Sequence, residues 1–130
     1  MTTHTREIAM DEWRFFFDNA SRHYQGREVK IELLGPDLGV HVLSQRLPLM
    51  GITVEENPGG GGAEIQIMTG DPEKGNVTHV ISAPRHVWIE QEINGGDNAI
   101  EIESAGNAII IELSAERNSD VSRPCAEQFQ

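Results

Sequence analysis

The sequence contains few of the residues that mark specialised classes of protein. Its single cysteine, Cys125, excludes an intramolecular disulfide, so the chain carries no sign of an oxidising compartment. The longest purely apolar run, residues 108–111, is far shorter than the roughly 20 residues of a transmembrane helix. The first seven residues also lack the apolar segment of a secretory signal peptide. We therefore expect a cytoplasmic protein.

Basic residues are scarce as well. Ten lysines and arginines stand against 21 aspartates and glutamates, which gives a formal net charge of -11. Nucleic-acid phosphates and anionic lipid headgroups repel a chain of this charge. We therefore expect no nucleic-acid partner and no membrane partner.

The residues that are present fit one domain built mainly from strands. The 130 residues are 38% hydrophobic, which is enough for one core, and 13 isoleucines and eight valines outnumber seven leucines. Because β-branched side chains pack well on a pleated sheet and lose rotamer freedom on a helix, this balance favours a sheet. We expect a loose lead-in at residues 1–7, a single α+β domain at 8–115 and a flexible tail at 116–130.

Helical periodicity is confined to residues 11–24. Apolar side chains recur there at helical spacing and form one stripe, which consists of Trp13, Phe16, Phe17, Ala20 and Tyr24. Acidic residues occupy the first turn, and Gly26 is placed to end the helix. We expect this helix to pack its stripe into the core.

After Gly26 the hydrophobic pattern changes to a period of two, which predicts eight short strands. They cover residues 28–33, 40–43, 52–54, 65–68, 77–82, 86–93, 99–104 and 108–114. No helical pattern separates two strands, so the sheet should be antiparallel, and Pro48 indicates an edge or a corner. The predicted fold class is α+β, with one N-terminal helix packed on a strongly curved antiparallel sheet, or a partly closed barrel, of about eight strands in meander order.

No motif specifies a catalytic site, and no catalytic residue is predicted. The glycine run at 59–62 lacks the lysine and the following helix of a phosphate loop, and is typical of a hairpin loop. Residues 71–76 lack the alternating oxygen ligands of a calcium loop. Cys125 lies in the expected tail, where no fixed base could activate it.

The turns near the C-terminus predict a row of carboxylates across three strands. A two-residue loop at Gly106-Asn107 would pair Glu101 with Glu112, and a four-residue loop before residue 98 would pair Glu101 with Glu90. His79 would extend this row beside Glu90. These ligand types suit a divalent cation, the only cofactor that the sequence suggests, or a carboxyl group that acts as a general acid. The alternative is a solvated face on which arginines bridge the carboxylates.

Two other surfaces are candidate binding sites. Trp88 and Ile110 would lie on the outer face beside the carboxylate row, and an exposed tryptophan is typical of a protein interface. The alternative is that a helix or loop covers Trp88. A curved sheet packed on a helix also leaves a mouth for a small ligand, here near Trp13, Phe17 and Tyr24.

Several motifs, in their order along the chain, resemble a family of small, uncharacterised bacterial proteins known only as a domain of unknown function. The motifs are Arg6-Glu7-Ile8, Asp11-Glu12-Trp13 with Phe16-Phe17, Leu34-Gly35-Pro36-Asp37, Leu47-Pro48-Leu49, Val77-Thr78-His79, Pro84, Val87-Trp88, Glu90-Gln91 and Ile100-Glu101-Ile102-Glu103. The resemblance covers about residues 6–114. It implies a bacterial, cytoplasmic protein with one compact domain, and it implies no activity, cofactor or catalytic residue.

Three functions stay open at this point. The residues favour a non-enzymatic interaction module that binds a protein partner or forms a homo-oligomer. The first alternative is a small-ligand-binding domain with the ligand between the helix and the concave sheet. The second is a divalent-cation binder, or a cation-dependent enzyme, on the carboxylate row.

Overall fold

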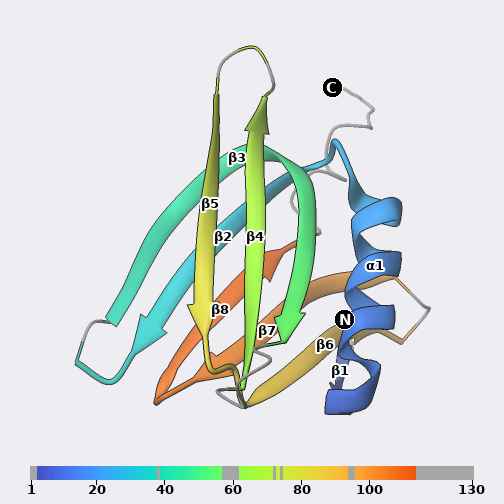
Figure 1. Cartoon of the computed structure of the whole chain (residues 1–130), viewed down its shortest axis with the longest axis vertical. Helices are drawn as coiled ribbons and strands as arrows, with labels where there is room; N and C mark the ends of the chain where they lie inside the picture. Colours follow the sequence, from blue (N-terminus) through green and yellow to red (C-terminus); the bar gives the residue numbers. More distant parts are fainter. Residues whose placement is uncertain are drawn as a thin grey trace.

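The computed structural model describes residues 3–37, 39–56, 62–71, 73, 75–93 and 96–113. In these residues one helix packs against an eight-stranded antiparallel sheet, as the sequence predicted (Figure 1). The elements in chain order are β1 (Thr3–Ile8), η1 (Met10–Glu12), α1 (Trp13–Tyr24), β2 (Glu28–Gly35), β3 (Gly39–Glu56), β4 (Ala63–Asp71), β5 (Gly75–Ser82), β6 (His86–Glu92), β7 (Asp97–Ser104) and β8 (Asn107–Glu112).

The sheet is an open one with the strand order β1-β6-β7-β8-β2-β3-β4-β5. Two meanders, β2 to β5 and β6 to β8, join side by side through the pairing of β8 with β2. β1 and β5 are the two edges, so the sheet does not close into a barrel. The part of the chain that the structure describes contains no helix long and apolar enough to cross a membrane.

Two strand predictions were wrong. Residues 3–7, expected to belong to a loose lead-in at 1–7, form β1 together with Ile8 and pair with β6. Five of the six side chains of β1 are exposed, so the strand has no alternating pattern that could reveal it, and its main chain is held by ladder hydrogen bonds. The strands predicted at 40–43 and 52–54 are parts of one strand, the 18-residue β3. The expected tail at 116–130 lies outside the described residues.

β3 folds the sheet over on itself. Its first half, up to Pro48, pairs with β2, and its second half, from Leu49, pairs with β4. Register shifts flank this point, and Arg46 has a φ of 60°, the kind of irregularity that bends a strand. Pro48 therefore lies at a corner, as predicted. Figure 1 shows β3 curving over, so that β4 and β5 face the layer of β6, β7 and β8.

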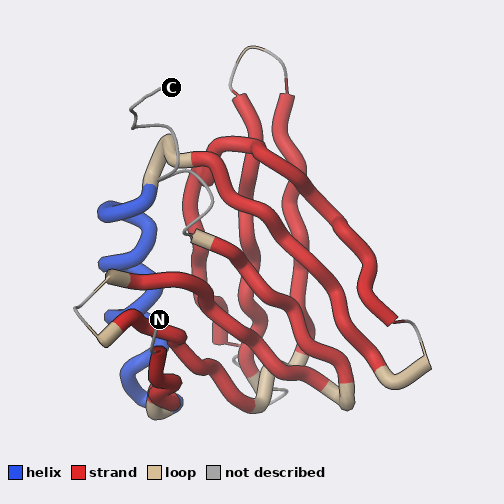
Figure 2. The backbone as a smooth tube through the Cα atoms, turned by 180° about the vertical axis from the view of Figure 1, so that it is seen from behind, coloured by secondary structure: helices blue, strands red, loops and turns tan. Residues whose placement is uncertain are grey.

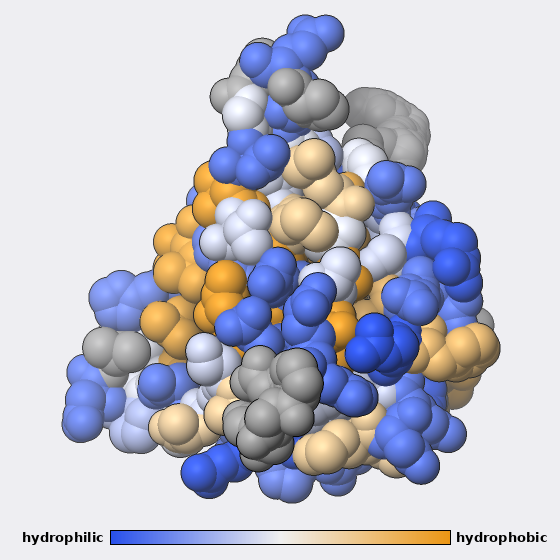
Figure 3. Space-filling view, viewed as in Figure 1, coloured by the Kyte–Doolittle hydropathy of each residue, from blue (hydrophilic) through white to orange (hydrophobic). Residues whose placement is uncertain are grey.

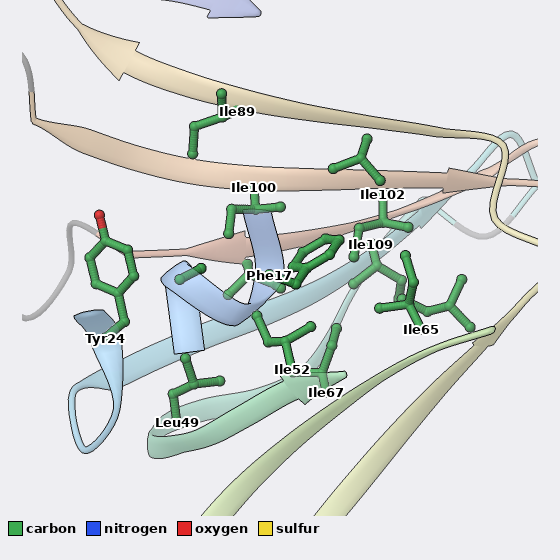
Figure 4. Packing of buried hydrophobic residues seen from close by; sticks show 14 of the residues in the cluster. Phe17, Tyr24, Leu49, Ile52, Ile65, Ile67, Ile89, Ile100, Ile102 and Ile109 are labelled. Atoms are coloured by element: carbon green, nitrogen blue, oxygen red, sulfur yellow. The ribbon is translucent and has the colours of Figure 1, made fainter. Parts of the chain in front are cut away.

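The core fills the space between the two layers, and α1 lies along one open side of it (Figures 1 and 2). The buried side chains of α1 are Trp13, Phe17, Ala20 and Tyr24, four of the five residues in the predicted stripe. Figure 4 shows the Phe17 ring among isoleucines from both layers. Ser21 fixes the helix to β3, because its Oγ accepts a hydrogen bond from the Ile52 amide at 2.8 Å and donates one to the Ile52 carbonyl at 3.0 Å.

Candidate functional site

A groove of about 710 Å³ lies between α1 and the edge of the sheet formed by β1, β6 and β7. It lies between the helix and the inner face of the sheet, the two elements between which the sequence analysis expected a ligand. The lining residues are Arg6, Ile8, Glu12, Phe15, Phe16, Asn19, Ala20, Arg22, His23, Tyr24, Ile89, Asp97 and Ile100.

The floor of the groove is apolar. Strand register places Ile89 of β6 between Arg6 of β1 and Ile100 of β7, so these three side chains share the inner face of the sheet. Ile8 adds a third isoleucine two residues along β1. On the helix side the small Ala20 side chain faces the groove and leaves room above this floor.

A hydrogen-bonded carboxylate closes one end of the groove. The Tyr24 hydroxyl donates a hydrogen bond to Asp97 Oδ2, and Gln91 Nε2 donates one to Asp97 Oδ1 at 2.9 Å. The Tyr24 ring is itself held in place, edge-on to the His23 ring at 4.6 Å and 5.3 Å below the Arg27 guanidinium. This end of the groove is therefore preorganised, and the carboxylate of Asp97 is already satisfied by protein donors.

Arg6 of β1 lies opposite Ile89, on the same face of the sheet as the floor of the groove. Its side chain is exposed, and among the described residues its guanidinium has no hydrogen bond or ion pair. Arg22, on the rim, donates instead to Asn19 Oδ1 at 2.8 Å. The groove thus combines an apolar floor with the guanidinium of Arg6, which has no protein partner among the described residues.

Only one of the three predicted ligand residues lines this groove. Tyr24 does, whereas Trp13 and Phe17, which are 2% and 0% exposed, belong to the core. The Trp13 indole donates its N–H to the Ile8 carbonyl at 3.0 Å. The helical residues that sequence reasoning missed lie along one margin of the buried stripe. The sequence offered one signal, an aromatic residue, Phe15, that lies next to the stripe and outside it. The structure shows that Phe15 is 71% exposed.

The predicted carboxylate row has a different register. The last hairpin turns at Ala105-Gly106, because Ser104 pairs with Asn107, and both turn residues have the positive φ of a type I′ turn. Every predicted pair of β7 with β8 is therefore shifted by two residues, and the predicted pairs of β6 with β7 are shifted by two as well, in a hairpin that has its own register shift between Glu90 and Gln91. Glu90 and Glu112 both lie opposite Ala99, and Glu101 lies in the next row, opposite Ile110 and Trp88. The shift is even, so the carboxylates keep the outer face that was predicted.

The electrostatics of this outer face follow from its crowding. Burial raises the pKa of Glu101, and the neighbouring charges of Glu103 and Glu90 raise it further. Burial also raises the pKa of Glu112, with a further contribution from the charge of Glu32. Lys30, whose Nζ lies 3.3 Å from Glu32 Oε2, acts in the opposite direction. The bridging cation is thus a lysine, whereas the sequence analysis expected arginines.

His79 does not join these carboxylates. It lies on β5, opposite Ile67, whereas the strand beside Glu90 is β1. His79 Nε2 lies 3.1 Å from Ser44 Oγ, and burial lowers the pKa of its ring. Within the described ranges, no three or more histidine, cysteine, aspartate or glutamate side chains are grouped so that they could hold a metal ion. The predicted four-residue cation site is therefore not assembled.

Trp88 and Ile110 lie on the outer face in one row, on either side of Glu101. Trp88 is only half exposed. The His86 ring stacks on it at 5.2 Å, and His86 Nδ1 in turn contacts Glu7 Oε2 at 2.7 Å. A side chain of its own strand, and not the helix, therefore covers part of Trp88.

Comparison with known proteins places the chain in a family. Residues 4–122 match the model of a family described as "Family of unknown function (DUF5335)". The chain belongs to this family. It is also 28% identical over 98 residues to an "Uncharacterized protein" of Aquifex aeolicus (strain VF5), an alignment that spans 75% of this chain and 80% of the relative. No solved structure matches. The resemblance noted in the sequence to a family of unknown function is thus confirmed.

Proposed function

We propose that the protein binds a small amphipathic anion in the groove between α1 and the β1-β6-β7 edge, without catalysing a reaction. The observation that carries this proposal is the pairing of an apolar floor with the unengaged guanidinium of Arg6. The volume of about 710 Å³ falls in the range typical of small-molecule sites, roughly 300–1,000 Å³.

The apolar part of the ligand would lie on the isoleucine floor. Ile89 and Ile100 are 2% and 0% exposed, so they are anchored in the core and form a fixed base beneath the groove. Water reaches the Phe15 ring, which is 71% exposed, and part of the Phe16 ring, both of which line the groove. Covering these rings removes hydrocarbon from water, which favours binding by about 25 cal/mol for each Å² of apolar surface. Either a flexible hydrocarbon chain or a flat ring would cover this apolar surface.

The acidic group of the ligand would pair with Arg6. A guanidinium binds a carboxylate through two parallel hydrogen bonds, a geometry that lysine cannot reproduce. Asp97 lies two strands away from Arg6, on β7, and its oxygens already accept from Tyr24 and Gln91. A negative head would avoid that end, so the two charged groups fix one orientation of the ligand.

The test uses decanoate and decanol, which have equal chains and differ in the head group. Isothermal titration calorimetry should detect binding of decanoate and weaker binding of decanol. Arg6→Gln should weaken decanoate binding by about tenfold, because it removes one charge-assisted pair at a partly exposed site, and should leave decanol unchanged. Arg14→Gln is the matched control, since Arg14 is an exposed arginine of α1 whose nearest ionic partner is Glu56 at 4.0 Å.

The result that rejects the proposal is equal affinity for the two compounds, or an equal loss of affinity in both arginine variants. Slow hydrogen exchange of the paired β1 amides in Arg6→Gln would show that β1 still pairs, so that a loss of binding is not a loss of structure.

Self-association, which the sequence favoured, is a second candidate function. The edge strand β5 favours it more than the predicted Trp88 and Ile110 surface does, because Trp88 is partly covered by His86. Replacing Trp88 by alanine should therefore leave the size of the particle in light scattering unchanged.

A further inference from the structure

The two edges of the sheet are protected to very different degrees. β1 carries charged and imidazole side chains at three of its six positions, His4, Arg6 and Glu7, and Arg6 points to the inner face. Charged residues on an edge strand, above all inward-pointing ones, prevent it from pairing with another molecule. The β1 edge is therefore blocked in the ordinary way.

β5 carries none of these charged side chains, and its one imidazole, that of His79, is half-buried and contacts Ser44. Its sequence from Gly75 to Ser82 contains no aspartate, glutamate, lysine, arginine or proline. Its pairing with β4 runs without a register shift over all eight residues, so no bulge twists the edge away. Val77 and Val80 are 46% and 53% exposed. A regular, uncharged and partly apolar edge is a template for another strand.

The surface beside β5 also has an unpaired strand edge and exposed apolar side chains. The outer edge of the first half of β3 is unpaired among the described residues, and this half exposes Val40, Val42 and Leu43. The contact between Ser44 and His79 places it next to β5. Figure 3 shows hydrophobic side chains gathered on the side of the molecule where these two strands lie.

We infer that β5 pairs antiparallel with β5 of a second copy of this chain, which joins the two sheets into one. Charge selects a second copy over another partner. Two copies of a chain with a net charge of -11 repel each other at most surfaces. On β5, which has no charged side chain, two copies can meet without placing like charges opposite each other. A strand related to itself by a two-fold axis is also antiparallel to itself, which is the direction of every pair in this sheet.

Sedimentation velocity, with reductant present to keep Cys125 from cross-linking copies, tests this inference. The parent protein should be a dimer in the micromolar range. Val80→Lys should weaken dimerisation at least about a hundredfold, because it places one lysine on each of the two pairing strands and these like charges repel. Ile93→Lys, which alters an exposed residue outside β5, should remain dimeric. Thr78→Lys provides a second edge variant if Val80→Lys does not fold.

A parent protein that is monomeric across this range overturns the inference, and so does a folded β5 variant that dimerises as the parent does. Hydrogen exchange gives an independent reading. The β5 amides that point away from β4 should exchange slowly in the parent, where they pair with the second copy, and fast in the lysine variant. Arg6 and β5 lie at opposite edges of the sheet, so this result does not depend on the ligand-binding proposal.

Discussion

Replacing Glu101 with glutamine should make the protein more stable at neutral pH. Partial burial on the outer face of β7 raises the pKa of Glu101, and the nearby charges of Glu103 and Glu90 raise it further. A group whose pKa is higher in the folded state than in the unfolded chain disfavours folding wherever it is ionised. Above the folded-state pKa the ionised Glu101 therefore costs stability, and this cost disappears as the pH falls through that value.

The size of the effect follows from the partial burial of Glu101 and from its two like-charged neighbours. Neither neighbour lies directly opposite Glu101, whose cross-strand partners are Trp88 and Ile110, so each costs no more than the few tenths of a kcal/mol of an opposed pair, and water screens a face that is half open. With two neighbours, Glu101→Gln should raise the free energy of unfolding by about 0.5–1 kcal/mol at pH 7. In a domain of this size that corresponds to an increase in Tm of roughly 2–6 °C.

Urea unfolding at a series of pH values measures this difference. The stability of the variant should exceed that of the parent at pH 7, and the two curves should converge in acid, where Glu101 is protonated. Glu73→Gln, an exposed residue of the β4–β5 turn, serves as the control and should change little. A variant less stable than the parent at pH 7 would show that Glu101 makes a favourable interaction, and would refute this account of the outer face.

Two further predictions concern the core and the β3–β5 contact. Phe17→Ala should lower the free energy of unfolding by about 3–5 kcal/mol, because the ring is fully buried among isoleucines of both layers. Phe15→Ala, on the exposed side of the same helix, should lower it by well under about 1 kcal/mol. Equal losses for the two variants in chemical denaturation would contradict the packing described. Burial lowers the pKa of His79, so the parent should lose stability as the pH falls through 6.5, the pKa of this group in the unfolded chain. The variant His79→Gln should lose less stability over the same interval. Parallel Tm curves for the two proteins between pH 7 and pH 5 would be evidence against this burial effect.

The sequence predicted those features that depend on local periodicity. The stripe on α1 is visible because side chains three and four residues apart share a face, and Phe17 and Tyr24 are buried as a result. The inner faces of β6, β7 and β8 were also predicted correctly. An error of two residues in register leaves a side chain on the same face, so the inward-facing isoleucines Ile100, Ile102, Ile109 and Ile111 still point into the core.

The register itself depended on a turn that two sequences could form. Gly106-Asn107 and Ala105-Gly106 both contain a glycine, and the chain places Gly106 at the second central position of the turn. β1 was missed because the signal of an exposed edge strand lies in its main-chain pairing and not in its side chains. The β3 corner was only partly anticipated, since Pro48 marks the bend without showing that the strand continues through it.

The groove could not be predicted in detail from the sequence. The spacing that buries Phe17 and Tyr24 does not say which margin of the stripe leaves a space against the sheet. That space depends on β1, an element without a local pattern, which brings Arg6 beside Ile89. The site therefore arises from the meeting of the helix with the one strand that the sequence concealed.

The most direct test of the central claim is an amide NMR titration of the 14.4 kDa protein with decanoate. If the ligand binds between α1 and the sheet edge, saturable shifts should concentrate at Ile8, Ala20, Ile89 and Ile100, and Arg6→Gln should reduce them. Shifts that concentrate on the outer face around Trp88, or that stay linear with decanoate concentration, would contradict a binding site in this groove.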